Sequence, residues 1–527
     1  MRDHLYQDLK YALRALRGSP GFTAVAVLSL ALGIGANTTV FTFVNAVLFR
    51  SLPYPGSDRI VVVRERPLEL DGTVNVHPFN FLEWRRRARS FDSLALLQTP
   101  PMNVMGADGA EQVARVQTTA ELFRVFGLEP VLGRMFTEEE TNPGNHRVVI
   151  LGHGFWQRWF GGDPGVLGRP LPVTDGALTI IGVAPAGFRI GLTEPEAYTP
   201  LEIDPARPNA IGSRSFQCYA RVKPDVSMAA VKAEMDVIAS GLAREFPLDR
   251  GYGVFVSPLH DYLAKDARRA LGLLMGVVAI VLVIACTNLG GLLLARGLNR
   301  RGELALRVSL GATRRRLVGQ LVTESLVLAV CGGTGGLVLA IWSTRALARL
   351  TAGALTLGTG EPIRLDATVL VFTCIVSIVT ALAVGVLPAW QGSRVDPQST
   401  LRRQSRAATA DRRQHGVRSL LVVSQVSLAV VLLVGAALLL RTFANLVRVD
   451  LGFEPAGTVT MRLFLGARPD EARIALLDRI LERVEALPGV TAAGTIQFLP
   501  LSGANCGTGF RREGDPAGDS SSSLSTE

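Results

Sequence analysis

Lysine is scarce in this chain, and its scarcity removes one class of function. Only four lysines occur among 527 residues, and none of them follows a glycine. A phosphate-binding loop of the G-x-x-x-x-G-K-[ST] type therefore cannot be drawn anywhere in the sequence. The chain does not bind ATP by that route, and we expect no cofactor in it.

Cysteine and histidine are also few, and their spacing supports no enzyme chemistry. Cys286, Cys331 and Cys374 lie within apolar runs, which is typical of packing residues. Cys218 and Cys506 lie in polar regions, and the sequence does not decide whether they form a disulfide bridge. The six histidines show no metal-ligand spacing, and neither G-x-S-x-G nor H-E-x-x-H occurs. We therefore expect no metal site and no catalytic residues.

Apolar residues and arginine, in contrast, are abundant. Hydrophobic residues make up 48% of the chain, the mean hydropathy is +0.29, and the formal net charge is +10. These values predict several membrane helices together with substantial water-exposed regions. The arginines cluster beside the apolar runs, as membrane topology requires, so we expect a lipid bilayer and no nucleic acid as partner.

Hydropathy predicts an α-helical multi-pass membrane protein with five transmembrane helices. Leucines at helical spacing predict a cytoplasmic amphipathic helix over 1–20, along the membrane surface. The first apolar run is too long for a signal peptide and lacks a clear cleavage site, so we interpret it as an uncleaved anchor with its N-terminus inside. The expected spans are 21–48, 270–295, 317–342, 367–390 and 420–440.

The arginines also set the expected orientation. The segments 296–316 and 391–419 contain seven arginines each, which places both in the cytoplasm. The segments 50–269, 343–366 and 442–527 then lie on the outer side.

The outer segment 50–269 has the pattern of a split α+β domain with a β-rich insert. Its middle, from about Thr118 to Pro200, is rich in glycine and proline and breaks into short strands. Trp156 and Trp159 are one helical turn apart, which favours core anchors over a ligand platform. We expect strands at 60–65, 148–151, 178–183, 217–223 and 252–257, helices at 79–89 and 228–246, and surface positions for His146 and His153.

Glycines within the predicted spans are candidates for close helix packing, because small residues let two backbones approach. Gly272 and Gly276 have the G-x-x-x-G spacing, and so do Gly332 and Gly336. Gly33 lies on a small-residue face of the first span.

Several segments resemble one family. The cytoplasmic segment from Glu303 to Leu317 and the segment 388–402 resemble the two signatures of FtsX-like permeases, the MacB-type membrane subunits of ABC systems. The pieces 121–136, 148–164 and 179–188 resemble the periplasmic domain of the same family.

This resemblance implies a function and a set of partners. A separate ABC ATPase chain would bind ATP and push on the cytoplasmic loop, in a bacterial inner membrane with the large domain in the periplasm. The permease would act as a homodimer or an intrachain pseudo-dimer, with a periplasmic adaptor as a further partner. The residues that the resemblance implies for ATPase coupling are Glu303, Leu306, Arg307, Leu310, Gly311 and Arg314.

The region after the fifth span resembles the start of a second repeat. We expect a strand at 458–464, a helix at 470–487 and a strand at 490–498. One such unit of roughly 40 residues is too small to bury a stable core alone. It either docks on the first domain or belongs to a truncated form of the duplicated permeases common in acidobacteria, and we favour truncation.

Two alternative functions stay open at this point. In the first, the helices only anchor an interaction protein that recruits or regulates a periplasmic envelope enzyme. In the second, the chain is an inactive, truncated remnant. Efflux, lipoprotein release and control of cell-wall hydrolases are all tasks of the family, and the sequence does not separate them.

Overall fold

The computed structural model describes two units, Met1–Val459 and Thr460–Glu527, which we treat separately. The described residues are 2–69, 71–106, 109–142, 144–191, 194–203, 214–299, 314–350, 364–392, 408–449, 457–461, 463 and 470–496.

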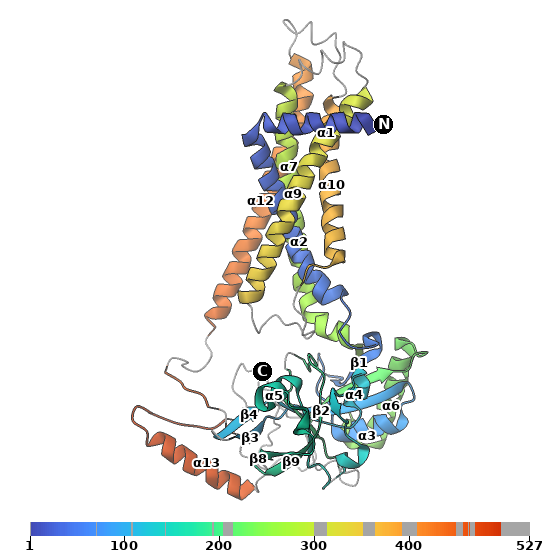
Figure 1. The fold of residues 1–527 in the computed structure, drawn as a ribbon, viewed down its shortest axis with the longest axis vertical. Helices are drawn as coiled ribbons and strands as arrows, with labels where there is room; N and C mark the ends of the chain where they lie inside the picture. The colour runs from blue at the N-terminus through green and yellow to red at the C-terminus, as the bar shows by residue number, and fades with distance from the viewer. Residues whose placement is uncertain are drawn as a thin grey trace. The chain divides into compact units, whose positions relative to one another are not determined.

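Among the described residues, the domain between the first two membrane helices is built around one mixed sheet, which has 12 strands and lies in the lower part of Figure 1. Four of its strands belong to two strand–helix–strand units. The first unit is β1, α3 and β2, and the second, which follows after a long insert, is β11, α6 and β12. They lie side by side as β12-β1-β11-β2, and every neighbouring pair is antiparallel. This is the ferredoxin-like arrangement, in which two βα units pair through their strands. The bounds are β1 Ile60–Pro67, α3 Pro78–Arg87, β2 Phe91–Gln98, β11 Gln217–Val222, α6 Met228–Glu245 and β12 Tyr252–Pro258.

Both faces of these strands are buried, which explains their nearly continuous apolar sequences. Val61 and Val63 of β1 pack toward α3 and α6, where Trp84 and Met235 lie. The alternate residues of β1 face a second core that contains helix α4 (Leu122–Phe126). The predicted helices and strands of this part are therefore present within two residues of their expected ends.

The β-rich insert extends the same sheet beyond β2. Its strands follow in the order β5-β10-β7-β9-β8-β3-β4, and β6 pairs with β9 from outside this path. Helix α5 (His153–Phe160) covers a core of its own, in which Trp156 is buried and donates its indole N–H to the carbonyl of Asp163 over 3.0 Å. The bounds are β3 Met102–Gly106, β4 Gly109–Val113, β5 Arg115–Thr118, β6 Leu132–Gly133, β7 Val148–Leu151, β8 Pro170–Val173, β9 Gly176–Val183 and β10 Ala197–Pro200.

The tryptophan pair is a core anchor, as the spacing predicted. Trp159 packs on Phe155 with ring centroids 5.2 Å apart and donates its indole N–H to Glu111 over 2.8 Å. His146 pairs with Glu202 at the surface. Both indole N–H groups therefore donate to acceptors within the protein.

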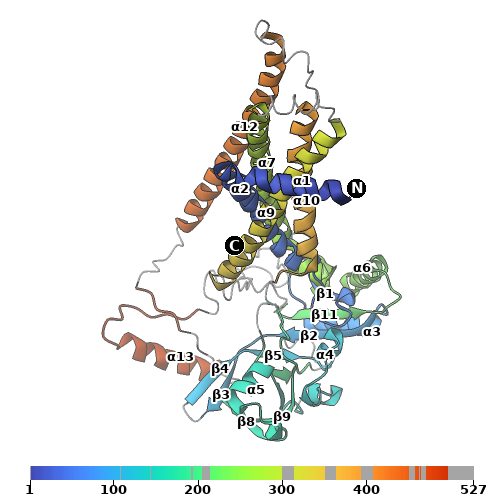
Figure 2. The same cartoon turned by 45° about the horizontal axis from the view of Figure 1, so that its top comes forward.

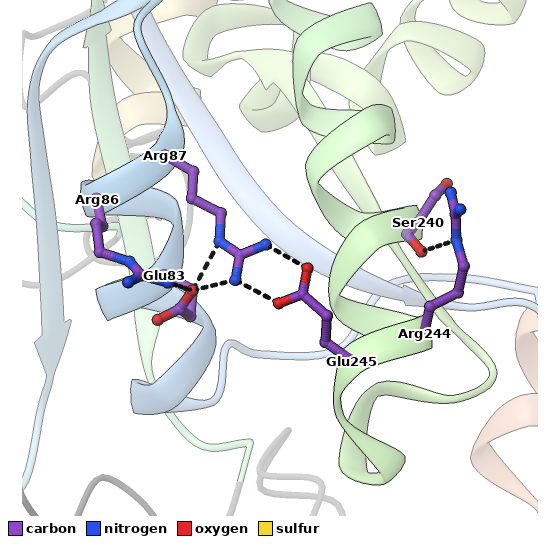
Figure 3. Close-up of polar contacts among 6 residues, drawn as sticks. All are labelled: Glu83, Arg86, Arg87, Ser240, Arg244 and Glu245. Carbon is purple, nitrogen blue, oxygen red and sulfur yellow. Dashed lines mark hydrogen bonds and ion pairs between the residues drawn. The ribbon is translucent and has the colours of Figure 1, made fainter.

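Helices α3 and α6 are joined by one arginine (Figure 3). Arg87 donates from Nε to Glu83 on its own helix over 2.7 Å. Its two terminal nitrogens donate to both carboxylate oxygens of Glu245 on α6, over 3.0 and 2.6 Å. Arg–carboxylate pairs of this bidentate form fix geometry better than single contacts. The pair thus sets the spacing of the two helices that cover the sheet.

In the part of the chain that the structure describes, five helices are long and apolar enough to span a bilayer, which confirms the predicted fold class. In addition, α1 (Arg2–Arg17) is a separate helix that crosses α9 in both views (Figures 1 and 2). The five are α2 Pro20–Val44 with a π-helical end at Asn45–Phe49, α7 Leu259–Asn299, α9 Arg314–Leu350, α10 Ala367–Gly392 and α12 Ala408–Val447.

The second unit differs from its prediction. Helix α13 (Asp470–Glu485) is present where an amphipathic helix was expected. The two expected strands are absent from the described residues of 458–464 and 490–498, so this prediction is wrong there. Val459 is 93% exposed, and a strand without a hydrogen-bonded neighbour has no stabilisation of its own.

Candidate coupling region

The predicted ATPase-coupling residues from Glu303 to Gly311 lie outside the described residues. The structure describes the two helices that bound this segment. α7 ends at Asn299, and α9 begins at Arg314, which is itself one of the predicted coupling residues. The region can therefore be characterised by what these two helices contact.

Helix α7 runs without interruption from the sheet domain to the coupling segment. It follows directly on β12 and contains 41 residues, which corresponds to about 60 Å. The hydrocarbon core of a bilayer is only about 30 Å thick, so α7 continues well beyond the membrane. Its N-terminal end is fixed by Tyr262, whose hydroxyl accepts from Arg64 of β1 over 2.8 Å. The predicted span began only at Ala270, because hydropathy does not detect the polar extension.

The contact between α2 and α9 depends on glycine. A Cβ added to Gly35 would lie 3.0 Å from the carbonyl oxygen of Gly336, and one added to Gly336 would lie 2.9 Å from the amide nitrogen of Gly35. A Cβ at Gly332 would lie 2.5 Å from the Cβ of Leu30. These are backbone or near-backbone atoms that cannot turn aside. Gly332 and Gly336 therefore lie in the closest contact between these two helices.

The other glycines predicted for helix packing differ from one another. Gly33 faces α7, where an added Cβ would lie 3.3 Å from that of Ala285. At Gly272 and Gly276 an added Cβ would meet no atom of the described chain within 4 Å, and both residues are exposed. The expected helix contact at these two positions is thus not present within the described chain.

Polar side chains of α2 form hydrogen bonds with neighbouring helices, a feature that was not predicted from the sequence. Asn37 is buried and donates to the carbonyl of Val278 on α7 over 2.8 Å. The hydroxyl of Thr38 lies 3.1 Å from that of Thr373 on α10. The signal was available, since Asn-Thr-Thr interrupts an apolar run.

The chain enters the sheet domain from α2 beside one buried arginine. Arg221 of β11 is 5% exposed. It donates to the carbonyls of Pro55 and Val125 over 2.8 Å each, and to that of Gly56 over 3.4 Å. Gly56 and Gly127 both have positive φ, and an added Cβ at either would lie within about 3 Å of the guanidinium. The arginine thereby ties the segment after α2 to the sheet and to α4.

A cluster of buried polar side chains joins the first and last parts of the ferredoxin-like unit. Glu65 of β1 is 1% exposed and accepts from the amide of His77 over 2.7 Å and from Asn80 over 2.9 Å. Arg214 pairs with Glu65 and, over 3.3 Å, with Asp249. Burial raises the pKa of Glu65 in spite of Arg214, and burial lowers the pKa of His77.

No group of three or more His, Cys, Asp or Glu residues in the described part of the chain could hold a metal ion. Cys218 is buried in the adjacent core, and burial raises the pKa of its thiol. Cys506, the other cysteine considered for a bridge, lies outside the described residues.

Comparison with known proteins gives two adjoining family matches. Residues 23–238 match the MacB-like periplasmic core domain, and residues 275–397 match the FtsX-like permease C-terminal domain. The first begins within α2 and ends within α6, and the second begins within α7 and covers α9, α10 and the segment between α7 and α9.

The curated relatives that match are named as export proteins. The Macrolide export ATP-binding/permease protein MacB of Bdellovibrio bacteriovorus is 24% identical over 52% of this chain and 41% of its own length. MacB of Wolinella succinogenes is 22% identical over 75% of this chain and 60% of its own. MacB 1/2 of Paracoccus denitrificans is 28% identical over 54% and 41%. The chain thus spans about half the length of the curated relatives it matches.

Among solved structures, the periplasmic region of MacB from Actinobacillus actinomycetemcomitans is 15% identical, with a TM-score of 0.30 over 40% of this chain and 94% of that one.

Taken together, these features define a multi-pass membrane protein with a bundle of helices and a large α+β domain inserted between the first two spans. The two matches lie in chain order on these two parts, and the signature segments lie within or beside them. The chain belongs to the FtsX-like, MacB-type permeases of ABC transporters.

Proposed function

We propose that this chain is the permease subunit of an ABC system that transmits ATP-driven motion from a separate ATPase chain to a periplasmic domain. The observation that carries the proposal is the continuity of α7 between the sheet domain and the segment that matches the coupling signature. A helix held at its outer end by Arg64 transmits a displacement along its axis without a flexible joint.

The proposal includes an orientation and a set of partners. The arginine-rich segments lie in the cytoplasm with the N-terminus, and the sheet domain lies in the periplasm of a cell with an inner membrane. The proposal places ATP on a separate ATPase chain, as the family resemblance implies, and no G-K-[ST] loop occurs in these 527 residues. The working unit pairs two permease cores, as a homodimer or within a longer chain, and engages a periplasmic adaptor for export or envelope work.

The contact with the ATPase rests on Glu303, Leu306, Arg307, Leu310, Gly311 and Arg314. Purification from native membranes in a gentle detergent, followed by mass spectrometry of bound proteins, tests this. We expect an ABC-type ATPase that is lost in Arg307→Ala and in Gly311→Asp. Arg349→Ala, at the opposite end of α9, is the matched control and should retain it.

Two outcomes would contradict the proposal. An ATPase retained in both loop variants would separate its binding from this segment. A periplasmic enzyme found in place of any ATPase would favour the alternative function, a membrane-anchored module that recruits or regulates that enzyme.

A further inference from the structure

One arginine at the end of α7 contacts three other helices. A terminal nitrogen of Arg296 lies 3.2 Å from Oε1 of Glu324 on α9. Its other terminal nitrogen donates to the carbonyl of Ala15 on α1 over 2.8 Å. The guanidinium carbon lies 4.5 Å from the ring centroid of Phe22 on α2. Four helices therefore meet at a single side chain.

Glu324 lies where a carboxylate is found paired with a cation. Glu324 is 4% exposed and lies in the candidate membrane span Val322–Leu347. A carboxylate at such a position is costly unless a cation neutralises it, and such groups are found paired. The pair therefore holds the end of α7 against the beginning of α9.

The contact with α1 is a separate feature of the same guanidinium. Ala15 lies in the last turn of α1, where the helix dipole favours a cation, and its carbonyl also accepts from the hydroxyl of Ser19 over 3.2 Å. The planar fork of arginine presents donors in several directions, so one side chain serves both the carboxylate and the carbonyl. A lysine ammonium has no such fork.

We propose that Arg296 and Glu324 are positioning residues that hold the C-terminal turn of α1 on the two helices bounding the coupling segment. Arg296 lies within the last turn of α7, next to that segment. A displacement of the segment therefore moves Arg296 and, through the Ala15 carbonyl, α1. The consequence for coupling rests on the proposed function, whereas the docking of α1 does not.

Hydrogen exchange of the α1 amides in the full chain, reconstituted in lipid nanodiscs, tests the docking directly. In Arg296→Gln, the amides of residues 12–19 should exchange faster by about tenfold to a hundredfold, because a hydrogen bond to a charged group is lost. Arg268→Gln, which removes an exposed pair with Asp261 on the same helix, should leave this exchange unchanged.

A charge exchange separates the two contacts. In Arg296→Glu with Glu324→Arg, the pair between α7 and α9 is restored, so the melting temperature should return toward the wild-type value. A glutamate at 296 cannot donate to the Ala15 carbonyl, so α1 should still exchange rapidly. If Arg296→Gln fails to fold, the exchange measurement is made on Arg296→Lys, which retains a cation beside Glu324. Faster exchange of the α1 amides is again expected.

Unchanged α1 exchange in the folded single variant would overturn the inference, and so would full α1 protection in the exchanged pair. Binding of the ATPase, measured on the same preparations, keeps the two proposals distinguishable. If α1 loosens but wild-type protein binds no ATPase, the docking stands and the proposed function fails. If the ATPase binds and α1 is unaffected, the proposed function stands and the inference fails.

Discussion

Replacing Gly336 by alanine should weaken the contact between α2 and α9 by an amount that the structure defines. The added Cβ would lie 2.9 Å from the amide nitrogen of Gly35 and 3.2 Å from the carbonyl oxygen of Ala31. Carbon contacts are normally about 3.5–4.0 Å, so the helices would have to separate by roughly half an ångström. Overpacking of this kind costs about 1–3 kcal/mol.

Gly336→Ala also changes the helix propensity of the position, and a matched control variant corrects for this second effect. Alanine is favoured over glycine within a helix by about 1 kcal/mol. Gly272 also lies inside a long helix, but an added Cβ there meets no described atom within 4 Å. The helix-propensity gain is thus common to Gly336→Ala and Gly272→Ala. Their difference in unfolding free energy should be about 1–3 kcal/mol, with Gly336→Ala the less stable.

Reversible unfolding in mixed micelles, driven by increasing SDS and followed by far-ultraviolet circular dichroism, measures this difference. Gly332→Ala should behave like Gly336→Ala, because its Cβ would lie 2.5 Å from that of Leu30. Gly276→Ala should behave like Gly272→Ala. If all four variants were equally stable, the close α2–α9 contact described above would be refuted.

Three further predictions concern single side chains. Burial lowers the pKa of His77 below its ordinary 6.5, so the folded chain binds fewer protons than the unfolded chain just below that pH. The stability of the chain should therefore fall as the pH falls through this window. In His77→Asn, which keeps an acceptor for the amide of Phe79, melting curves should lose this pH dependence. Arg221→Met should lower the unfolding free energy, measured by chemical denaturation, by about 2–5 kcal/mol, because three carbonyls lose their donor. Arg124→Met, which removes an exposed ion pair, is the control and should change it by less than about 0.5 kcal/mol. Asn37→Leu should cost about 1 kcal/mol in the SDS titration, and no loss would show that its bond to α7 contributes nothing.

Much of the fold could be predicted because its causes are local. The apolar runs identify all five membrane helices, and β1 follows from a run of valines buried on both faces. The polar ends of α7 and α12 were missed, because a helix continues where backbone geometry allows while hydropathy detects only the part inside lipid. The two strands expected after 457 were wrong, because β-propensity does not supply a partner strand.

The candidate site was less predictable, because it depends on which helices become neighbours. Gly272 and Gly276 have the same spacing as Gly332 and Gly336, yet only the second pair contacts another helix in the described chain. Spacing shows that two glycines share a face, but it does not show what covers that face. The partnership of Arg296 with Glu324 is equally invisible in the sequence, since the segment between α7 and α9 separates them.

The three residues Asn37, Thr38 and Thr39 explain why α2 occupies the centre of this arrangement. Successive residues of an α-helix point about 100° apart, so three in a row face three different directions. Asn37 reaches α7, Thr38 reaches α10, and the hydroxyl of Thr39 lies 2.8 Å from that of Ser343 on α9. A helix bound to three neighbours at one level cannot slide past any of them without breaking a hydrogen bond within an apolar bundle. Motion of α7 should therefore move α2, α9 and α10 together at this level. Any relative movement of the helices during coupling should be concentrated at their ends, where Arg296 of α7 lies and where Arg221 of β11 binds the segment after α2.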